Sequence, residues 1–382
     1  MKNIKILAIN PYETIQYYEN RPMEEARFFK AHDCNVETIL MERKVAGNKV
    51  AANKIADINT LHFICKDDRL ISRLSKSRIG NGLKKVVYFG WYVRFILWLR
   101  KYLKSEKPDS LICHNIEMAL AGVWAGRKKV DNIVFVMREM YEGQSTRALK
   151  NRVIKLVSGY VQNRSDFLVH VVPKQMEYTS EKNRNKVIYI PNYPKEEIYS
   201  KIVHKESVMI RINYIGSVRD VKSLKMLMDA AQGLKGIKIG IHGMGEAYEE
   251  LKSIEHAYKN VDITGYYNYA EDTEKLFADT DIIYCAYNIE VPNWRAAYPI
   301  KLYEAIATGI PVILCKGMAP ERFVISNGCG FVFDYNVDSL RALLSEIVEK
   351  KELLLEKQKG VQNLKGEYTW NKVVQEYLKI LI

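Results

Sequence analysis

The residues best suited to chemistry lie in the second half of the chain, where basic side chains follow a glycine. The segment Tyr214–Ser223 leaves an apolar run, turns at Gly216 and enters a helix predicted to begin near Ser223. Arg219 and Lys222 therefore stand beside a helix N-terminus, whose free N–H groups and dipole favour an anion. A diphosphate suits this pattern, although solvated surface charges would also fit the spacing.

Two other loops follow predicted strands and carry residues that could contact a ligand. Ile241–Glu246 places Gly243 after a strand, which permits close approach of the backbone. Near the N-terminus Tyr12 follows the strand Ile4–Ile9, and its ring could stack on a sugar. An ordinary surface loop explains Tyr12 equally well.

Asp279 and Asp281 form a D-x-D pattern, which can hold a metal ion and a nucleotide diphosphate. Their places argue against that role, because Asp279 falls at a predicted helix end and Asp281 leads the apolar run 282–284. The sequence contains no His/Cys cluster with the spacing of metal ligands. We therefore predict no metal and no cofactor.

Strands and helices alternate through both halves of the 382-residue chain and must position these residues. Strands are predicted at 4–9, 110–114, 133–137, 167–172 and 186–190, and then at 209–215, 238–242, 261–264, 281–286, 311–314 and 330–333. A charged linker follows Ile190–Pro194. The pattern predicts an α/β protein with two Rossmann-like domains, whose parallel sheets bind ligands beyond the carboxyl ends of the strands.

The net charge of +13 is concentrated in one stretch, since residues 66–107 hold twelve Lys/Arg and three Asp/Glu. Within it, a helix over Val86–Leu103 gathers basic and aromatic side chains on opposite sides: Arg94, Arg100, Lys101 and Lys104 against Trp91, Phe95, Trp98 and Tyr102. Its uncharged run is too short to cross a bilayer. Such a helix either lies on an anionic membrane or packs on its own domain. No recognition motif accompanies the charge, so nucleic acid is not expected.

The cysteines and the N-terminus bear on location. None of the six cysteines forms a C-x-x-C pair, which is typical of reduced thiols in a cytosolic protein. The N-terminal apolar run is interrupted by Lys5 and is predicted to be a strand, not a signal peptide. We expect a cytoplasmic protein, at the inner face of the cell membrane if the basic helix binds lipid.

The sharpest motif lies in Tyr298–Val312, where E-x-x-A-x-G-x-P-V begins at Glu304 and follows Pro299. It resembles the donor-site signature of the large retaining family of GT-B glycosyltransferases, glycosyl transferases group 1 (family 4). Further segments resemble that family's motifs in the same order: Asp109–Asn115, Arg138–Tyr141, Ile190–Asn192, Tyr214–Lys222, Val261–Tyr284, Gly317–Glu321 and Gly328–Phe331. The resemblance covers nearly the whole chain.

The resemblance implies a GT-B fold, with two Rossmann-like domains facing a cleft. Residues 1–195 would bind the acceptor and residues 196–360 the nucleotide sugar. A C-terminal helix over 361–382 would pack back on the first domain.

The resemblance also implies roles for residues. Glu304 would accept hydrogen bonds from the donor's ribose, Lys222 would neutralise the diphosphate, and Arg219 completes the implied catalytic set. Other implied donor-binding residues are Gly216, Ser217, His242, Gly243, Gly265, Tyr266, Pro299 and Lys301. Tyr12, His114, Arg138 and Glu139 are expected on the acceptor or sugar side.

Three positions depart from the family's pattern. Ala296 stands where the family has its first glutamate, Ser217 where it has an arginine, and Arg138 where it has a histidine. Arg219 could supply the missing phosphate cation with help from Lys301.

The function implied is retaining, metal-independent transfer of a hexose from a nucleotide diphosphate sugar to a saccharide or lipid-linked acceptor, in cell-surface polysaccharide or glycolipid synthesis. The departing phosphate would draw the proton from the acceptor hydroxyl, so positioning and electrostatics carry the catalysis. Two alternatives stay open: a weak or inactive relative acting as a binding subunit, and a nucleotide-sugar epimerase.

Overall fold

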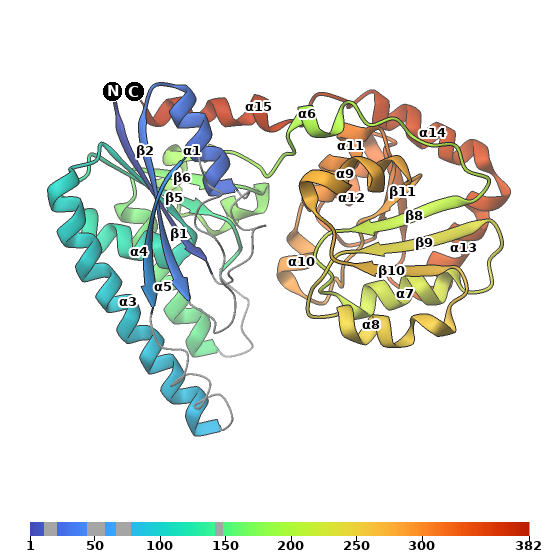
Figure 1. Ribbon diagram of the computed structural model, residues 1–382, viewed down its shortest axis with the longest axis horizontal. Helices are drawn as coiled ribbons and strands as arrows, with labels where there is room; N and C mark the ends of the chain where they lie inside the picture. Colours follow the sequence, from blue (N-terminus) through green and yellow to red (C-terminus); the bar gives the residue numbers. More distant parts are fainter. Residues whose placement is uncertain (11–20, 44–57, 66–77, 142–147, 382) are drawn as a thin grey trace. The chain divides into compact units, whose positions relative to one another are not determined.

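The computed structural model describes residues 1–10, 21–43, 58–65, 78–141 and 148–381. Tyr12 and much of the basic stretch before residue 78 lie outside this part of the chain. The chain divides into two compact units. Unit 1 comprises residues 1–191 and 374–382, and unit 2 comprises residues 192–373 (Figure 1).

Unit 1 is built on a seven-stranded sheet with the order β3-β2-β1-β4-β5-β6-β7, in which every pairing is parallel. The strands are β1 (Asn3–Asn10), β2 (Asn35–Arg43), β3 (Asn59–Cys65), β4 (Ser110–His114), β5 (Asn132–Met137), β6 (Phe167–His170) and β7 (Val187–Tyr189). The central strands are buried on both faces because helices cover the sheet on each side.

One face of this sheet is covered by a layer of three helices: α3 (Arg78–Glu106), α4 (Asn115–Gly126) and α5 (Ala148–Arg164) (Figure 1). The other elements of unit 1 are α1 (Arg21–Ala31), the 3-10 helices η3 (Pro173–Tyr178) and η4 (Glu181–Lys186), and the C-terminal 3-10 helix η6 (Val374–Ile380). Rings from α1 and η6 meet, because Phe29 and Tyr377 lie 5.3 Å apart.

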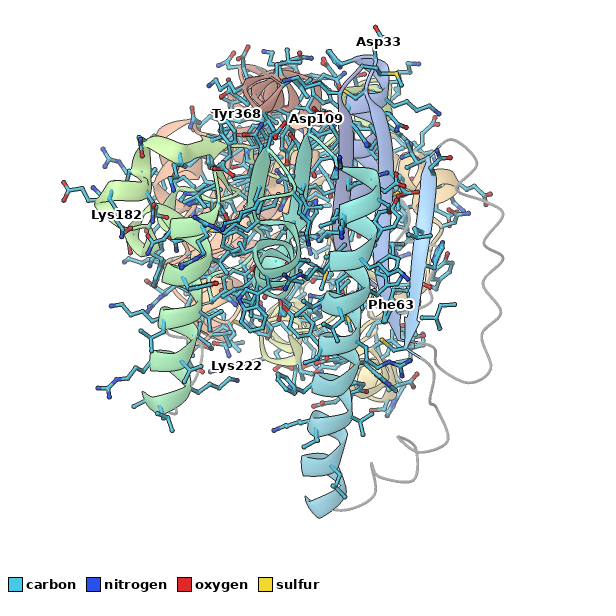
Figure 2. All side chains as sticks on the ribbon, turned by 90° about the vertical axis from the view of Figure 1, so that its left-hand side faces the viewer. Asp33, Phe63, Asp109, Lys182, Lys222 and Tyr368 are labelled. Carbon is cyan, nitrogen blue, oxygen red and sulfur yellow. The ribbon has the colours of Figure 1, made fainter. Side chains whose placement is uncertain are left out.

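Helix α3 packs its aromatic side on its own unit. Phe95 is fully buried, and Trp98 and Phe95 contact Phe63 of β3, which Figure 2 labels beside the helix. Trp91 is half-buried. Of the two alternatives for the Trp-bearing side, packing on the domain is the one observed. No helix in the described part of the chain is both long and apolar enough to cross a membrane.

Unit 2 has a six-stranded parallel sheet with the order β10-β9-β8-β11-β12-β13. Its strands are β8 (Ile210–Ile215), β9 (Ile237–His242), β10 (Val261–Gly265), β11 (Ile282–Tyr284), β12 (Val312–Cys315) and β13 (Gly330–Phe333). Its helices are α6 (Glu196–Tyr199), α7 (Val221–Ala231), α8 (Tyr248–Ile254), η5 (Glu255–Ala257), α9 (Tyr269–Ala278), α10 (Pro292–Ala296), α11 (Ile300–Thr308), α12 (Glu321–Ser326), α13 (Val337–Glu349), α14 (Lys351–Gln362) and α15 (Trp370–Val373). The strand order reverses at β8, where such sheets bind ligands.

The C-terminal segment differs from the expected helix over 361–382. Helix α14 ends at Gln362, and the chain then turns through Gly366, whose φ is +81°, before α15 begins at Trp370. The Trp370 N–H donates to the Pro194 carbonyl at 2.8 Å, so α15 is held to unit 2. Only residues 374–382 group with unit 1, and the first boundary falls at residue 191 instead of 195.

Candidate functional site

Three glycine-bearing loops meet at the carboxyl ends of β8, β9 and β10. The Gly216 N–H donates to the His242 carbonyl at 2.9 Å, and the Gly243 N–H donates to the Gly265 carbonyl at 2.7 Å. A Cβ at Gly243 would lie 1.9 Å from the Gly216 carbonyl oxygen, so no side chain fits between the loops. The sequence-predicted glycines of these loops are therefore brought together, with their backbones in close contact.

Lys301 supplies a buried cation beside this loop cluster. It lies in the first turn of α11, which begins after Pro299, and is only 5% exposed. Its ammonium lies 3.2 Å from the ring centroid of Tyr214, and a Cβ on Gly216 would be 3.6 Å from Lys301 Nζ. Among the described residues, Nζ has no hydrogen-bond partner. Aromatic faces hold this charge without satisfying its donors.

Glu304 lies one turn further along α11 and is also buried. The Tyr199 hydroxyl donates to Glu304 Oε1 at 2.7 Å and is itself 2.7 Å from the Tyr269 hydroxyl. Burial raises the pKa of the Glu304 carboxyl, while the Tyr199 hydrogen bond and the Lys301 charge oppose that rise. Tyr199 comes from α6, which lies within the segment predicted as the charged linker, and sequence analysis did not identify it.

Arg219 and Lys222 stand at the start of α7, which begins at Val221. Asp220 caps the helix by accepting from the Ser223 N–H at 3.1 Å, and it also accepts from the Asn288 N–H at 2.6 Å. Arg219 Nε donates to Ser217 Oγ at 2.8 Å, which holds the guanidinium beside the Gly216 loop. Lys222 donates to the exposed Glu290 carboxylate at 2.8 Å.

The remaining predicted residues of unit 2 differ in their surroundings. His242 Nδ1 is 2.9 Å from Thr264 Oγ1, and burial lowers the pKa of its ring. Tyr266 is exposed. Ala296 is buried at the end of α10. A small apolar side chain therefore occupies the position at which the family's pattern has a glutamate.

The D-x-D pair lies at the amino end of β11, away from the loops that follow the carboxyl ends of the strands. Asp281 precedes β11 and accepts from Arg211 Nε at 2.9 Å, and Asp279 accepts from Arg211 at 3.2 Å. Both carboxylates are thus paired with a cation. Over the described residues no group of three His, Cys, Asp or Glu side chains could hold a metal ion.

In unit 1, His114 belongs to a buried polar cluster. Its Nε2 is 2.8 Å from Glu25 Oε2, and Arg21 Nε donates to Glu25 Oε1 at 2.7 Å. Arg21 also donates to the Ile190 carbonyl at 2.7 Å, and the Tyr377 hydroxyl donates to Glu25. His114 is 1% exposed, so the expected contact with an acceptor is not available to its ring in this arrangement.

The charges of this cluster balance. Burial disfavours the ionised Glu25, but the attractions of His114 and Arg21 outweigh it and lower the pKa of the carboxyl to about 2. Burial lowers the pKa of His114, against the attraction of Glu25. Arg21 is the permanent counter-charge of this carboxylate, and His114 Nε2 lies within hydrogen-bond distance of it. Sequence analysis missed Arg21, Glu25 and Tyr377.

Arg138 and Glu139 follow β5, half-buried and exposed respectively. Near the carboxyl ends of β1 and β2 there is a hollow of about 210 Å³. Its walls are mainly apolar and aromatic, with one carboxylate: Ile9, Met41, Tyr88, Phe89, Trp91, Tyr92 and Glu117. Tyr12, expected on the same side, lies outside the described residues.

Comparisons with known proteins bear on family and fold. Residues 195–362 match the family model described as Glycosyl transferases group 1. No curated protein sequence matches the chain. Among solved structures the chain is similar to sucrose-phosphate synthase from Thermosynechococcus elongatus, with a TM-score of 0.72 and 11% identity over 100% of this chain and 98% of that chain.

Two ligand complexes are similar over equally long stretches. Anabaena HepE in complex with UDP-glucose has a TM-score of 0.69 and 13% identity, covering 99% of each chain. A S. aureus TarM mutant in complex with Fondaparinux, alpha-GlcNAc-glycerol and UDP has a TM-score of 0.68 and 11% identity, covering 100% of this chain and 99% of that chain. At these identities the likeness shows the fold.

Proposed function

Because residues 195–362 match the family model of the group 1 glycosyl transferases and the chain has the GT-B fold, we propose that the protein is a retaining glycosyltransferase. In this proposal it moves a hexose from a nucleotide diphosphate sugar to an acceptor, without a metal. The observation that carries it is the buried Lys301 ammonium, whose donors are unsatisfied beside the Gly216 loop. A buried cation of this kind is costly unless an anion binds it.

The diphosphate is placed at Lys301 and at the start of α7. Backbone N–H groups at a helix N-terminus, with Arg219 and Lys222 beside them, add to the attraction. Ser217 keeps Arg219 at the loop, so Arg219 takes the part of the arginine that the family has at position 217.

The ribose is placed at Glu304. Its Oε1 already accepts from Tyr199, which leaves Oε2 for a sugar hydroxyl. A hydrogen bond to a buried carboxylate is stronger than one between neutral groups. His242, Gly243, Gly265, Tyr266 and Pro299 border the same loops and complete the proposed donor-binding residues.

In the proposed reaction the bond from the sugar's anomeric carbon to the diphosphate oxygen breaks, and the acceptor oxygen bonds to that carbon on the same face. The acceptor's proton passes to the departing phosphate oxygen. The protein then contributes cations that stabilise the negative leaving group and contacts that align the reactants.

The acceptor is assigned to unit 1. Arg138, Glu139 and the aromatic hollow with Glu117 offer charged and ring surfaces suited to a saccharide or a lipid-linked sugar. The complexes of HepE with UDP-glucose and of TarM with alpha-GlcNAc-glycerol make a UDP-hexose and a sugar-bearing acceptor the first pair to test. Six buried free cysteines favour the reducing cytoplasm, where we propose that it acts.

The test is to incubate the protein with a panel of nucleotide sugars and candidate acceptors and to measure the nucleoside diphosphate released. We expect release that needs the acceptor, persists with a metal chelator, and falls strongly in Glu304→Gln. Donor binding without release would instead favour a binding subunit, the alternative that Ala296 supports. Conversion of one nucleotide sugar into another, without transfer of the sugar to an acceptor, would identify an epimerase.

A further inference from the structure

One face of unit 1 exposes apolar and basic side chains on the same helices. It is the outer surface of the α3, α4 and α5 layer, whose inner side packs on the sheet through Phe95, Leu99 and Val161. We call it the α3–α5 face. Its exposed large apolar residues are Leu83, Val86, Phe89, Val93 and Leu97 of α3, Trp124 of α4, and Leu149, Val153 and Leu156 of α5.

These apolar side chains form stripes and are not scattered. On α5, Leu149, Val153 and Leu156 recur at intervals of four and three, which puts them on one side of the helix. Leu149 is 74% and Leu156 68% exposed, and Phe89 of α3 is 66% exposed. Exposed large apolar side chains that line up along a helix in this way point to a site of interaction.

The same helices carry a strong positive charge. Helix α5 has no acidic residue, and α3 has one, Glu106, which pairs with Lys5. The exposed basic residues are Lys85, Arg94, Arg100, Lys101 and Lys104 of α3 and Lys150, Arg152 and Lys155 of α5. No described carboxylate forms an ion pair with any of them.

Both helices extend beyond the sheet they cover. In Figures 1 and 2 the N-terminal turns of α3 and α5 project past the carboxyl ends of the strands, with the two helices flanking α4. Leu83, Val86 and Phe89 lie in the N-terminal half of α3, and Leu149 and Val153 lie in the N-terminal half of α5.

We propose that the α3–α5 face docks on an anionic lipid bilayer. Apolar side chains at the headgroup boundary leave water, while the neighbouring Lys and Arg side chains reach anionic headgroups. The charge distinguishes this occupant from the others. A second copy would bring two positive faces together, and a nucleic acid would leave Leu149, Leu156 and Phe89 exposed.

The proposal stands apart from the transfer reaction, because none of these residues belongs to the proposed donor or acceptor site except Phe89. It also differs from insertion of Trp91 and Trp98, which pack on unit 1. The residues now assigned to the membrane are the opposite side of α3 together with α5.

Vesicle flotation tests the part that α5 plays. The wild type is compared with Arg152→Gln/Lys155→Gln, with Val153→Ser/Leu156→Ser, and with a matched control on α14 of unit 2, Lys351→Gln/Leu355→Ser, whose residues are also exposed. Vesicles of phosphatidylcholine are used with and without phosphatidylglycerol, at low and physiological salt. Thermal unfolding checks that each variant is folded.

We expect wild-type binding to anionic vesicles that weakens with salt and is slight on neutral vesicles. The charge variant should bind on the order of 10- to 30-fold more weakly. The apolar variant should also bind more weakly while keeping its salt dependence, and the α14 control should match the wild type. Unchanged binding by both α5 variants would overturn the proposal. A dimer that these variants dissociate, or duplex DNA bound in preference to vesicles, would equally overturn it.

Discussion

At the scale of single residues, Lys301 combines two properties that pull in opposite directions. Its buried ammonium lacks hydrogen-bond partners, which costs stability, while the ring of Tyr214 3.2 Å away repays part of that cost. We predict that Lys301→Met, which keeps the length of the side chain, changes the free energy of unfolding by less than about 1 kcal/mol.

Donor binding should respond differently. Loss of a charged hydrogen bond to the diphosphate should weaken nucleoside diphosphate binding by roughly 10- to 100-fold, measured by titration calorimetry. The control is Lys350→Met, because Lys350 is an exposed lysine directly after the end of α13. A large loss of stability with unchanged affinity would show that Lys301 is structural only.

Glu290 is a second residue whose effect on donor binding can be measured separately from its effect on stability. Its carboxylate accepts from Lys222 at 2.8 Å, and both side chains are more than half exposed. If Lys222 binds the diphosphate, Glu290 competes with the donor. Glu290→Gln should therefore tighten donor binding by a factor of roughly two to five with little effect on stability. Weaker binding in this variant would mean that Glu290 helps to hold the donor.

Sequence analysis could group candidate site residues that lie close together along the chain. Lys301 and Glu304 lie on one short helix after Pro299, so the motif alone placed them together. The unit 1 cluster could not be found in this way, because Glu25 and Tyr377 are 352 positions apart. His114 was identified, but its partners were not, and its burial follows from them.

At the scale of elements, η6 is held to unit 1 by a buried hydroxyl. Tyr377 is fully buried, its hydroxyl donates to Glu25, and Arg21 donates to it at 3.3 Å. Tyr377→Phe keeps the ring and removes these bonds, so unit 1 should lose about 1–3 kcal/mol. Hydrogen exchange of peptides covering β4 and β5 measures this loss.

Tyr160→Phe is the matched control, because the Tyr160 hydroxyl lies on the exposed side of α5. Unchanged exchange in Tyr377→Phe, with η6 peptides still protected, would show that apolar packing alone holds this segment.

Helix α3 shows what periodicity can and cannot establish. Its aromatic side was evident from the sequence, and the fully buried Phe95 lies at the centre of it. Its second apolar stripe, which includes Val86 and Leu97, was not evident, because the helix is apolar on two sides and its hydrophobic asymmetry is small. The proposed contact of α5 with a membrane rests on the exposure of its apolar side chains, which the sequence alone does not show.

At the scale of the whole molecule, stability should depend on acid pH through Glu25. Its pKa in the folded state, about 2, lies below the ordinary value of 4.5. The unfolded state therefore binds more protons between these values, so stability is present above pH 4.5 and lost as pH falls towards 2. The full loss is roughly 3 kcal/mol.

Denaturant unfolding of the wild type and of Glu25→Gln across this range measures the effect. The wild type should lose stability more steeply with falling pH than the variant. Glu24→Gln, next to it and paired with Arg27, should follow the wild type. Parallel curves for the wild type and Glu25→Gln would contradict the assignment.

The α/β class was predicted correctly from the alternation of strands and helices, and the GT-B fold from the resemblance to the glycosyltransferase family. Two strands of unit 1 were missed for a physical reason. In β2, Glu37, Glu42 and Arg43 interrupt the apolar run, and β3 is an edge strand with partly exposed residues. Neither has the continuous apolar character of a buried parallel strand.

The division of the chain has a consequence for the order of its synthesis. Unit 1 is discontinuous, because residues 192–373 form unit 2 before residues 374–382 return to unit 1. A ribosome working from the N-terminus therefore completes all of unit 2 before Tyr377 exists. Until then Arg21 and Glu25 lack the ring that covers them, so the first unit to be started is the last to be finished.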